Sequence, residues 1–178
     1  MESRKRTKIV VAGPFSAGKS QFITTACRLR TLRTETAVTD ETVFEKNHTT
    51  VAMDFGRVEF SKDRTLYLFG TPGQERFEFM WEILTVGMHA LLIIVDATDL
   101  ASSKDAVKIC NYYHDRFNIP IVVCANKQDL SHSRTREQMY AALDLPRSFP
   151  LLPLIARDPN SVRMVLRRVV EETETWLY

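Results

Sequence analysis

The sequence lacks any hydrophobic run long enough to cross a membrane, and its first residues lack the apolar core of a signal peptide. Residue 2 is Glu rather than the Gly that myristoylation needs, and the final Trp-Leu-Tyr is no prenylation signal. An excess of charge is also absent, since the formal net charge is +2. We therefore expect a cytoplasmic protein with no direct membrane anchor and no affinity for nucleic acid.

Cysteine is scarce as well. Cys27, Cys110 and Cys124 lie far apart in apolar stretches, which argues against a disulfide framework or a metal site and predicts reduced, buried thiols. The four histidines are scattered and show no metal-binding spacing. Repeats, linkers and low-complexity segments are missing too, so we expect residues 1–178 to form a single domain.

What the chain does contain is an alternation of short apolar runs with helical patterns. The near-continuous apolar runs are typical of parallel strands that helices cover on both faces. Two of the runs flank a short polar turn and predict a hairpin that adds one antiparallel edge strand. The predicted strands are 8–12, 51–60, 65–69, 90–96, 119–125 and 151–155, and the predicted helices are 19–29, 102–116, 134–143 and one that starts at Pro159. This order predicts a three-layer α/β fold with a six-stranded, mostly parallel sheet.

The last helix has clear start signals. Asp158 is a suitable N-cap and Pro159 suits the first helical position. The residues expected on its buried stripe are Val162, Val165, Leu166, Val169, Val170, Thr173, Trp176 and Leu177. The stretch 30–49 is polar and has no clear period, which favours a functional loop.

Residues 13–20 read Gly-Pro-Phe-Ser-Ala-Gly-Lys-Ser and match the P-loop pattern. The segment lies between a predicted strand and a predicted helix, so its backbone amides and the helix N-terminus can hold phosphate oxygens. Lys19 is expected to reach the β- and γ-phosphates, and the Ser20 hydroxyl to bind Mg²⁺. The nucleotide contacts predicted here are Gly13, Phe15, Ser16, Ala17, Gly18, Lys19, Ser20 and Gln21. The motif indicates a nucleoside triphosphate but does not select the base.

Residues 126–129, Asn-Lys-Gln-Asp, follow a predicted strand and have the pattern of a guanine-binding loop. The Asp129 carboxylate can accept hydrogen bonds from guanine N1–H and the exocyclic amine, a donor pair that adenine lacks. Asn126 is expected to contact the base and tie this loop to the P-loop, and the Lys127 stem to cover the base plane. Together with the P-loop, this pattern favours GTP and GDP as ligands.

On these two motifs the whole chain resembles the Ras superfamily of small GTPases, whose P-loop domain is called the G domain. Residues 50–55 are similar to Rab-type switch I, and the resemblance implies that Thr50, rather than the adjacent Thr49, closes on Mg²⁺ and the γ-phosphate. In the part similar to switch II, it implies that Gly73 binds the γ-phosphate. Catalysis would rest on Gln74, which orients the attacking water, and on Lys19. Ala156 and Arg157 occupy the place of the family's Ser-Ala-Lys loop, where the Ala156 amide would bind guanine O6.

The sequence departs from the family in two places. Gly70 replaces the aspartate that normally holds Mg²⁺ through water, and Phe15 and Ser16 replace small P-loop residues. With the Pro-Gly-Gln that follows, these features resemble the prokaryotic branch, which includes gliding-motility polarity GTPases and actinobacterial conserved-operon GTP-binding proteins. That resemblance implies a regulator or effector partner of the roadblock/longin fold.

A neighbouring carboxylate can fill the space that Gly70 leaves. Residues of the predicted hairpin whose numbers sum to about 123–125 should face each other, which places Asp54 opposite Gly70 or one step away. Asp96, at the end of the next strand, is the second candidate. The predicted metal ligands are therefore Ser20 and Thr50, with Asp54 acting through water.

Two functional hypotheses follow. The chain is a switch that slowly hydrolyses GTP and controls partner binding through switch I (about 31–54) and switch II (about 70–82), or it is a scaffold that depends on GTP or GDP but hydrolyses poorly. Gln74 favours the first; Gly70 and Phe15 favour the second. A small-metabolite kinase is disfavoured by the guanine motif. Any arginine finger within the chain would come from Arg33, Arg57, Arg64 or Arg76.

An apolar cluster follows switch II and has two readings. Phe77, Phe79, Met80 and Trp81 either pack the switch II helix on the core or form a partner-binding surface.

Overall fold

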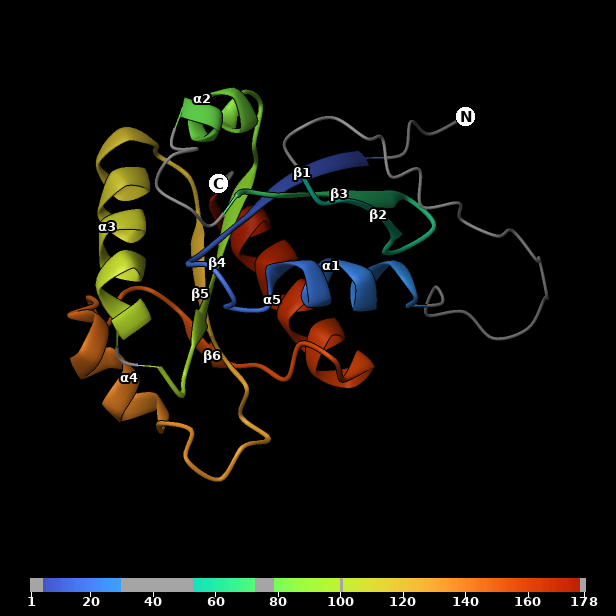
Figure 1. The fold of residues 1–178 in the computed structure, drawn as a ribbon. Coiled ribbons are helices and arrows are strands. Elements are labelled where there is room, and N and C mark those ends of the chain that lie inside the picture. The colour runs from blue at the N-terminus through green and yellow to red at the C-terminus, as the bar shows by residue number, and fades with distance from the viewer. Residues whose placement is uncertain (1–4, 30–52, 73–78, 100, 177–178) are drawn as a thin grey trace.

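The computed structural model describes residues 5–29, 53–72, 79–99 and 101–176. The strands of this part form one six-stranded sheet in the order β2-β3-β1-β4-β5-β6 (Figure 1). The strands are β1 (Lys5–Ala12), β2 (Phe55–Glu59), β3 (Arg64–Gly70), β4 (Ala90–Asp96), β5 (Ile121–Asn126) and β6 (Leu151–Pro153). The helices are α1 (Lys19–Cys27), α2 (Phe79–Thr85), α3 (Ala101–Arg116), α4 (Arg136–Leu143) and α5 (Pro159–Trp176).

The sheet is parallel except at one edge. β1 pairs in parallel with β3 and β4, β4 with β5, and β5 with β6. β2 pairs antiparallel with β3 and lies at the edge of the sheet. The predicted fold, a six-stranded, mostly parallel sheet with one antiparallel edge strand, is therefore confirmed.

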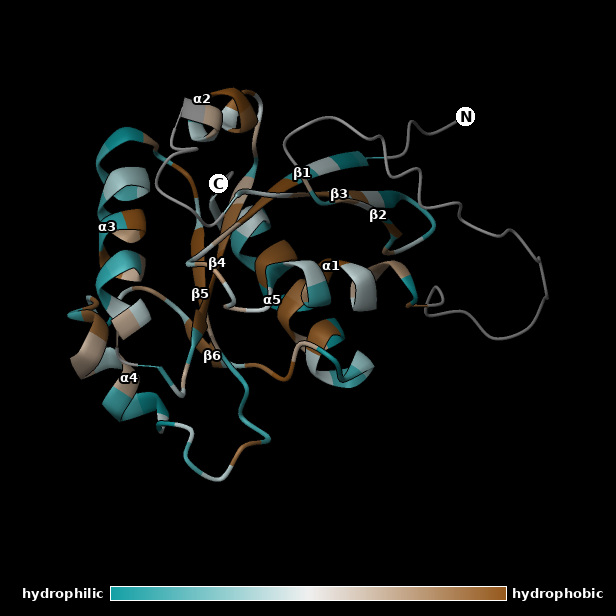
Figure 2. Ribbon diagram, in the orientation of Figure 1, coloured by the Kyte–Doolittle hydropathy of each residue, from teal (hydrophilic) through white to brown (hydrophobic). Residues whose placement is uncertain are grey.

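Two apolar clusters lie on opposite faces of the sheet and make the fold three layers thick. One cluster joins α1 and α5 to alternate residues of β1, β3 and β4. The other joins α2, α3 and α4 to the intervening residues of β1, β4 and β5. Figure 2 shows the central strands as mostly hydrophobic, in agreement with the continuous apolar runs of their sequences.

Several element boundaries differ from the predicted ones. β1 begins at Lys5 rather than at residue 8, because Lys5 and Arg6 pair with the start of β3 although their side chains are exposed. β2 begins only at Phe55, and residues 51–52 lie outside the described part of the chain. β6 ends at Pro153 at the far edge of the sheet, the edge position that its proline predicts.

Helix α5 confirms its start signals and most of its predicted stripe. The Asp158 carboxylate accepts a hydrogen bond from the Ser161 amide at 2.9 Å, and the helix begins at Pro159. The stripe from Val162 to Thr173 is buried as predicted. Trp176 is 52% exposed, so its expected burial was wrong; its indole N–H bonds the Asn118 carbonyl at 3.2 Å instead.

The three cysteines differ in burial. Cys110 and Cys124 are buried free thiols, whereas Cys27 is only half-buried, and burial raises the pKa of Cys110 to about 12. Within the described residues, no helix has the length and apolar character needed to cross a membrane.

Candidate nucleotide-binding site

The P-loop connects the carboxyl end of β1 to the first turn of α1. Gly13 and Gly18 have backbone φ angles of 144° and 104°, which residues with a Cβ rarely adopt. A Cβ on Gly13 would lie 2.1 Å from the Ile94 carbonyl oxygen, and one on Gly18 would lie 2.2 Å from Asn126 Nδ2. Both glycines are therefore required by the close approach of backbone and side chains.

Lys19 points back into this loop. Its Nζ donates hydrogen bonds to the carbonyls of Gly13 at 2.8 Å and Pro14 at 2.6 Å, and the residue is 8% exposed. Burial lowers the pKa of Lys19 to about 8, although the nearby Asp54 carboxylate acts in the opposite direction. Lys19 therefore carries its charge at neutral pH on the inner side of a loop shaped for phosphate.

Other residues predicted in the P-loop lie at its rim. Phe15 and Ser16 are exposed, with Phe15 at 68%, and Ser16 has a positive φ of 62°. Gln21 is exposed, and its amide donates to Thr25 Oγ1 at 3.1 Å along the helix. Ala17, by contrast, is buried, and its carbonyl accepts a hydrogen bond from Asn126 at the end of β5.

Asn126 joins three segments. Its Nδ2 donates to the Ala17 carbonyl at 2.8 Å, and its Oδ1 accepts from the Ala156 amide at 2.9 Å. Asn126 is 3% exposed, so both bonds are shielded from water. The predicted tie between the guanine loop and the P-loop is present. The Ala156 amide, predicted to meet guanine O6, bonds Asn126 in this structure, so a base oxygen would have to share or replace that bond.

Lys127 and Asp96 form an ion pair beside this loop. Lys127 Nζ donates to Asp96 Oδ2, and Asp96 Oδ1 accepts from the Thr98 amide at 2.8 Å and the Thr98 hydroxyl at 2.6 Å. The pKa of Asp96 is lowered because these hydrogen bonds and the Lys127 charge outweigh the opposing effect of its burial. Asp96 was the second candidate for the metal position. In this structure its carboxylate is engaged at the guanine loop, which favours Asp54 over Asp96 for the metal position.

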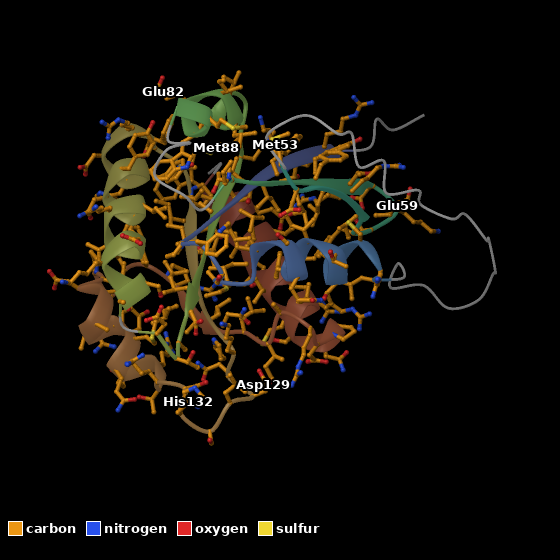
Figure 3. All side chains as sticks on the ribbon, in the orientation of Figure 1. Met53, Glu59, Glu82, Met88, Asp129 and His132 are labelled. Atoms are coloured by element: carbon orange, nitrogen blue, oxygen red, sulfur yellow. The ribbon has the colours of Figure 1, made fainter. Side chains whose placement is uncertain are left out.

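Asp129 lies beyond this pair, on the loop after β5 (Figure 3). Its Oδ2 accepts from Arg157 Nη2 at 2.5 Å. Two predicted nucleotide contacts, one on the loop after β5 and one on the loop after β6, are thus in direct contact. The Lys127 backbone has a positive φ of 68° at this turn, and its side-chain ammonium pairs with Asp96 rather than with Asp129.

At the other end of the site, Asp54 lies opposite Gly70. Phe55 pairs with Phe69 across the hairpin, and the next amide, that of Gly70, donates to the Asp54 carbonyl at 2.8 Å. A Cβ on Gly70 would lie 3.0 Å from Asp54 Cβ and 3.0 Å from Ile23 Cδ1, so Asp54 occupies space that a larger residue at 70 would need. The placement predicted for Asp54 is confirmed.

The Asp54 carboxylate reaches the first turn of α1. Its Oδ2 accepts a hydrogen bond from the Ser20 hydroxyl. A hydroxyl beside a carboxylate, next to a phosphate-binding loop, is a set of hard oxygen ligands of the kind Mg²⁺ prefers. Among the described residues no group of three or more His, Cys, Asp and Glu side chains could hold a metal ion. The Ser20 hydroxyl and the Asp54 carboxylate are few but suitable oxygen donors, and they fit Mg²⁺ that also takes phosphate and water oxygens.

Some predicted residues cannot be placed. Thr50, Gly73 and Gln74 lie outside the described residues, as do Arg33 and Arg76.

Of the other two arginine-finger candidates, Arg57 is exposed on β2, where it pairs with Glu59 at 3.0 Å. Arg64 was wrong as a candidate, because it is buried at the start of β3 and pairs with Glu174 of α5 at 2.5 Å. The P-loop follows the opposite, carboxyl ends of the parallel strands.

The cluster after switch II serves partly to pack α2. Trp81 is 5% exposed and lies against Tyr112 and Tyr113 of α3, with ring centroids 5.1 and 5.9 Å apart. Its Nε1 is buried without a hydrogen-bond partner. Phe77 and the Phe79 side chain lie outside the described part. For Trp81 the packing interpretation is confirmed.

A P-loop after β1, joined by a buried asparagine to an Asn-Lys-x-Asp loop after β5, defines the Ras-like class of P-loop nucleotide-binding domains. Solved structures agree on the fold: the Arl6 BBS3 small GTPase from Trypanosoma brucei, determined with a bound nucleotide analogue, matches with a TM-score of 0.72 over 97% of this chain and 99% of that one, at 18% identity.

Sequence comparisons lead to the same class. An uncharacterized protein of Methanocaldococcus jannaschii is 29% identical over 75% of this chain and 78% of its own length. The Ras-related protein RabC of Dictyostelium discoideum is 28% identical over 98% of this chain and 87% of its own. Human ADP-ribosylation factor-related protein 1 is 28% identical over 68% of this chain, and the match spans 59% of its own length.

A protein-family model described as "Conserved hypothetical ATP binding protein" matches residues 11–176. The chain belongs to that family, and its relatives place it within the Ras superfamily as a small GTP-binding protein of the Ras and Arf type.

Proposed function

We propose that this chain is a molecular switch that binds GTP with Mg²⁺, hydrolyses it slowly to GDP and phosphate, and controls a partner through its switch segments. The observation that carries the proposal is the Asn126 side chain, which bonds the P-loop at 2.8 Å and the Ala156 amide at 2.9 Å. That connection supports a single site in which Lys19 would bind the phosphates and Asp129 would bind the base.

Guanine is favoured over adenine by the chemistry of Asp129. An ionised carboxylate only accepts hydrogen bonds, and the guanine edge supplies two adjacent N–H donors, whereas adenine has no N1 proton. The family description mentions ATP, but the Asn-Lys-x-Asp loop of this chain supports GTP. We therefore propose GTP and GDP as the ligands.

Magnesium would be held by the Ser20 hydroxyl and by Thr50, with the Asp54 carboxylate orienting a bound water. The hydrogen bond between Ser20 and Asp54 supports this assignment. When bound, Mg²⁺ neutralises charge that develops on the β- and γ-phosphate oxygens. Asp54 then takes the role of the aspartate that Gly70 replaces.

Hydrolysis would follow the general scheme for phosphoryl transfer. A water held by Gln74 attacks the γ-phosphorus, the bond to the β–γ bridging oxygen breaks, and Lys19 stabilises charge on the phosphate oxygens. Without an arginine finger such sites turn over on the order of 10⁻⁴ per second. The switch segments, about 31–54 and 70–82, would transmit the change to a regulator or effector, for which a roadblock/longin-fold protein is our proposed class.

A hydrolysis-impaired scaffold is the second candidate, and Phe15 favours it. Phe15 is 68% exposed on the P-loop, where it can obstruct an arginine finger supplied by a partner. In that case the chain would act through which nucleotide it holds rather than through turnover.

Single-turnover hydrolysis of Mg²⁺–GTP separates the two candidates. The parent chain should release phosphate on the order of 10⁻⁴ per second, and Gln74→Ala should slow it further. Glu171→Ala, which changes an exposed residue of α5, is the matched control and should hydrolyse at the parent rate. Phosphate release that is absent in the parent while GTP stays bound would favour the scaffold. A fast rate in the isolated chain would instead require an arginine finger within it.

A further inference from the structure

The contact between Arg157 and Asp129 links the two loops expected to surround the base. Arg157 Nη2 donates to Asp129 Oδ2 at 2.5 Å. The side chains differ in exposure, with Arg157 at 73% and Asp129 at 23%. The Asp129 side chain is therefore more covered than that of Arg157, although Asp129 as a whole residue is exposed.

This ion pair is not needed to hold the loops together. Exposed ion pairs contribute little to folding stability, since solvent screens them and both side chains lose freedom. The loops are already joined by the Asn126–Ala156 bond and by the Gln128 amide, which donates to the Leu154 carbonyl at 3.2 Å. The Asp158 amide also closes the second loop through the Ile155 carbonyl at 2.9 Å. A role in stability therefore does not account for the contact.

The orientation of the Asp129 carboxylate, by contrast, depends on Arg157. Lys127, two residues before Asp129, sends its ammonium to Asp96. Ile155, which precedes Ala156, has an apolar side chain and offers no donor. Within the described residues, Arg157 is the hydrogen-bond donor that contacts the Asp129 carboxylate.

A carboxylate has enough acceptor capacity for this bond and for a base at once. Its two oxygens carry about four lone-pair sites, and guanine N1–H and the 2-amino group would use two of them. Arg157 occupies a site on Oδ2 and leaves the others available. A fixed carboxylate plane lowers the entropy lost when the base binds.

We propose that Arg157 is a positioning residue that orients the Asp129 carboxylate toward the N1–H and 2-amino donors of guanine. The inference rests on the proposed guanine-nucleotide function and assigns part of its base selectivity to a side chain outside the Asn-Lys-x-Asp motif. Arg157 acts through Asp129 and need not touch the base itself.

Calorimetric titration of the full chain with GDP, IDP and ADP tests this role, because hypoxanthine in IDP is guanine without the 2-amino group. Arg157→Met removes the donor at similar length, and Arg157→Lys retains a charged donor. Arg147→Met is the matched control, since Arg147 makes a comparable exposed ion pair with Glu137 at 2.7 Å outside the site. Thermal unfolding checks that each variant folds, and Asp129→Ala provides the background for a double-mutant cycle.

Arg157→Met should lower GDP affinity about fivefold to tenfold and lower IDP affinity less, so the GDP-to-IDP preference falls about threefold. Arg157→Lys should retain more of the preference for GDP over IDP, and Arg147→Met should retain all of it. In the Asp129→Ala background, Arg157→Met should cause no further loss of GDP affinity. Equal losses for GDP and IDP, or a loss that persists without Asp129, would overturn the inference while the parent still prefers GDP. A parent chain that binds ADP as tightly as GDP would overturn the proposed function instead, and this inference with it.

Discussion

The two ends of the candidate site are built in different ways. At the base end, the motif residues bond to one another and to their neighbours: Asn126 to the P-loop, Lys127 to Asp96, and Asp129 to Arg157. At the proposed metal end, Gly70 stands where the family has an aspartate, and the nearby carboxylate is that of Asp54, the residue before β2.

On the proposed assignment, the metal end would keep its chemistry although its carboxylate comes from a new position in the sequence. The base end needs a particular edge of hydrogen-bond acceptors, which only a fixed loop provides. The metal end needs only a carboxylate near Ser20, and both Asp54, just before β2, and position 70, at the end of β3, lie near it. An antiparallel pair brings opposite residues within about 4.5–5.5 Å, so a carboxylate can come from either strand.

The largest effect is expected from removing the side chain that joins the base end to the P-loop. Asn126→Ala would leave the buried Ala17 carbonyl and Ala156 amide without their partner. Each of the two unsatisfied groups costs about 1–3 kcal/mol, so the free energy of unfolding should fall by about 2–6 kcal/mol. Urea unfolding measures the change, and Asn111→Ala, on the exposed side of α3, is the matched control. A loss below about 0.5 kcal/mol would mean that the bridge is dispensable.

The next effect concerns base choice at the same end. Asp129→Asn replaces an acceptor-only carboxylate by an amide that presents a donor to guanine, and xanthine should fit better. At roughly 1.5–3 kcal/mol per charged hydrogen bond, GTP affinity should drop on the order of tenfold to a few hundredfold. Fluorescence titration with GTP and XTP measures the shift, and Asp105→Asn on the exposed face of α3 is the control. Unchanged GTP affinity would remove Asp129 from the site.

Two matched substitutions, Asp54→Asn and Asp96→Asn, distinguish a role at the metal end from a role at the base end. Asp54→Asn should raise the Mg²⁺ concentration needed for half-maximal GTP binding about tenfold. A loss of this size in metal affinity is typical for a residue that orients a metal ligand. Asp96→Asn should leave Mg²⁺ dependence unchanged, because Asp96 bonds Lys127 and Thr98.

Titration of GTP binding against Mg²⁺ concentration measures both variants. If Asp54→Asn matches the parent, Asp54 does not compensate for Gly70. If Asp96→Asn shifts the Mg²⁺ titration and Asp54→Asn does not, then Asp96 rather than Asp54 is the carboxylate that supports Mg²⁺.

A smaller effect is expected from pH, because Lys19 has a pKa of about 8 in the folded chain. Below pH 8 the Lys19 ammonium is protonated and can pair with phosphate. Above pH 8 Lys19 loses its proton in the free protein, whereas a bound phosphate would keep Lys19 protonated. GDP affinity should therefore fall as pH rises through 8, by up to about tenfold per unit. Lys19→Met should remove this dependence. A parent profile that stays flat from pH 7 to 9 would contradict the role of Lys19.

The same pKa gives a signed effect on folding. The folded-state pKa lies below the ordinary lysine value of 10.5, so between about pH 8 and 10.5 the unfolded chain binds more protons than the folded one. The Lys19 contribution to stability therefore rises with pH across that window, since the penalty for burying its charge is present in full only below pH 8. Urea unfolding of the parent and of Lys19→Met at pH 7 and 10 compares the two slopes.

Much of the fold and part of the site could be predicted because their signals are local. The apolar run at 90–96 coincides with β4, and Asp158 with Pro159 marks the start of α5. The hairpin turn fixed the register well enough to place Asp54 opposite Gly70. In each case a short stretch of sequence determines the geometry.

The contacts that escaped prediction depend on which segments become neighbours. Asp96 pairs in parallel register with Asn126, so it lies one residue from Lys127, but no motif marks Asp96 as the partner of that lysine. Arg64 reads as an ordinary exposed arginine until α5 brings Glu174 beside it. Arg157 likewise meets Asp129 only because β5 and β6 are adjacent, and their following loops converge.

Nucleotide preference of the purified full chain tests the central claim most directly. Bound nucleotide is first removed, and the chain is then titrated with GDP and ADP in the presence of Mg²⁺. The Asp129 carboxylate predicts that GDP binds at least about a hundredfold more tightly than ADP, since two charged hydrogen bonds are lost with adenine. Equal affinity for the two nucleotides, or tighter binding of ADP, would contradict the account.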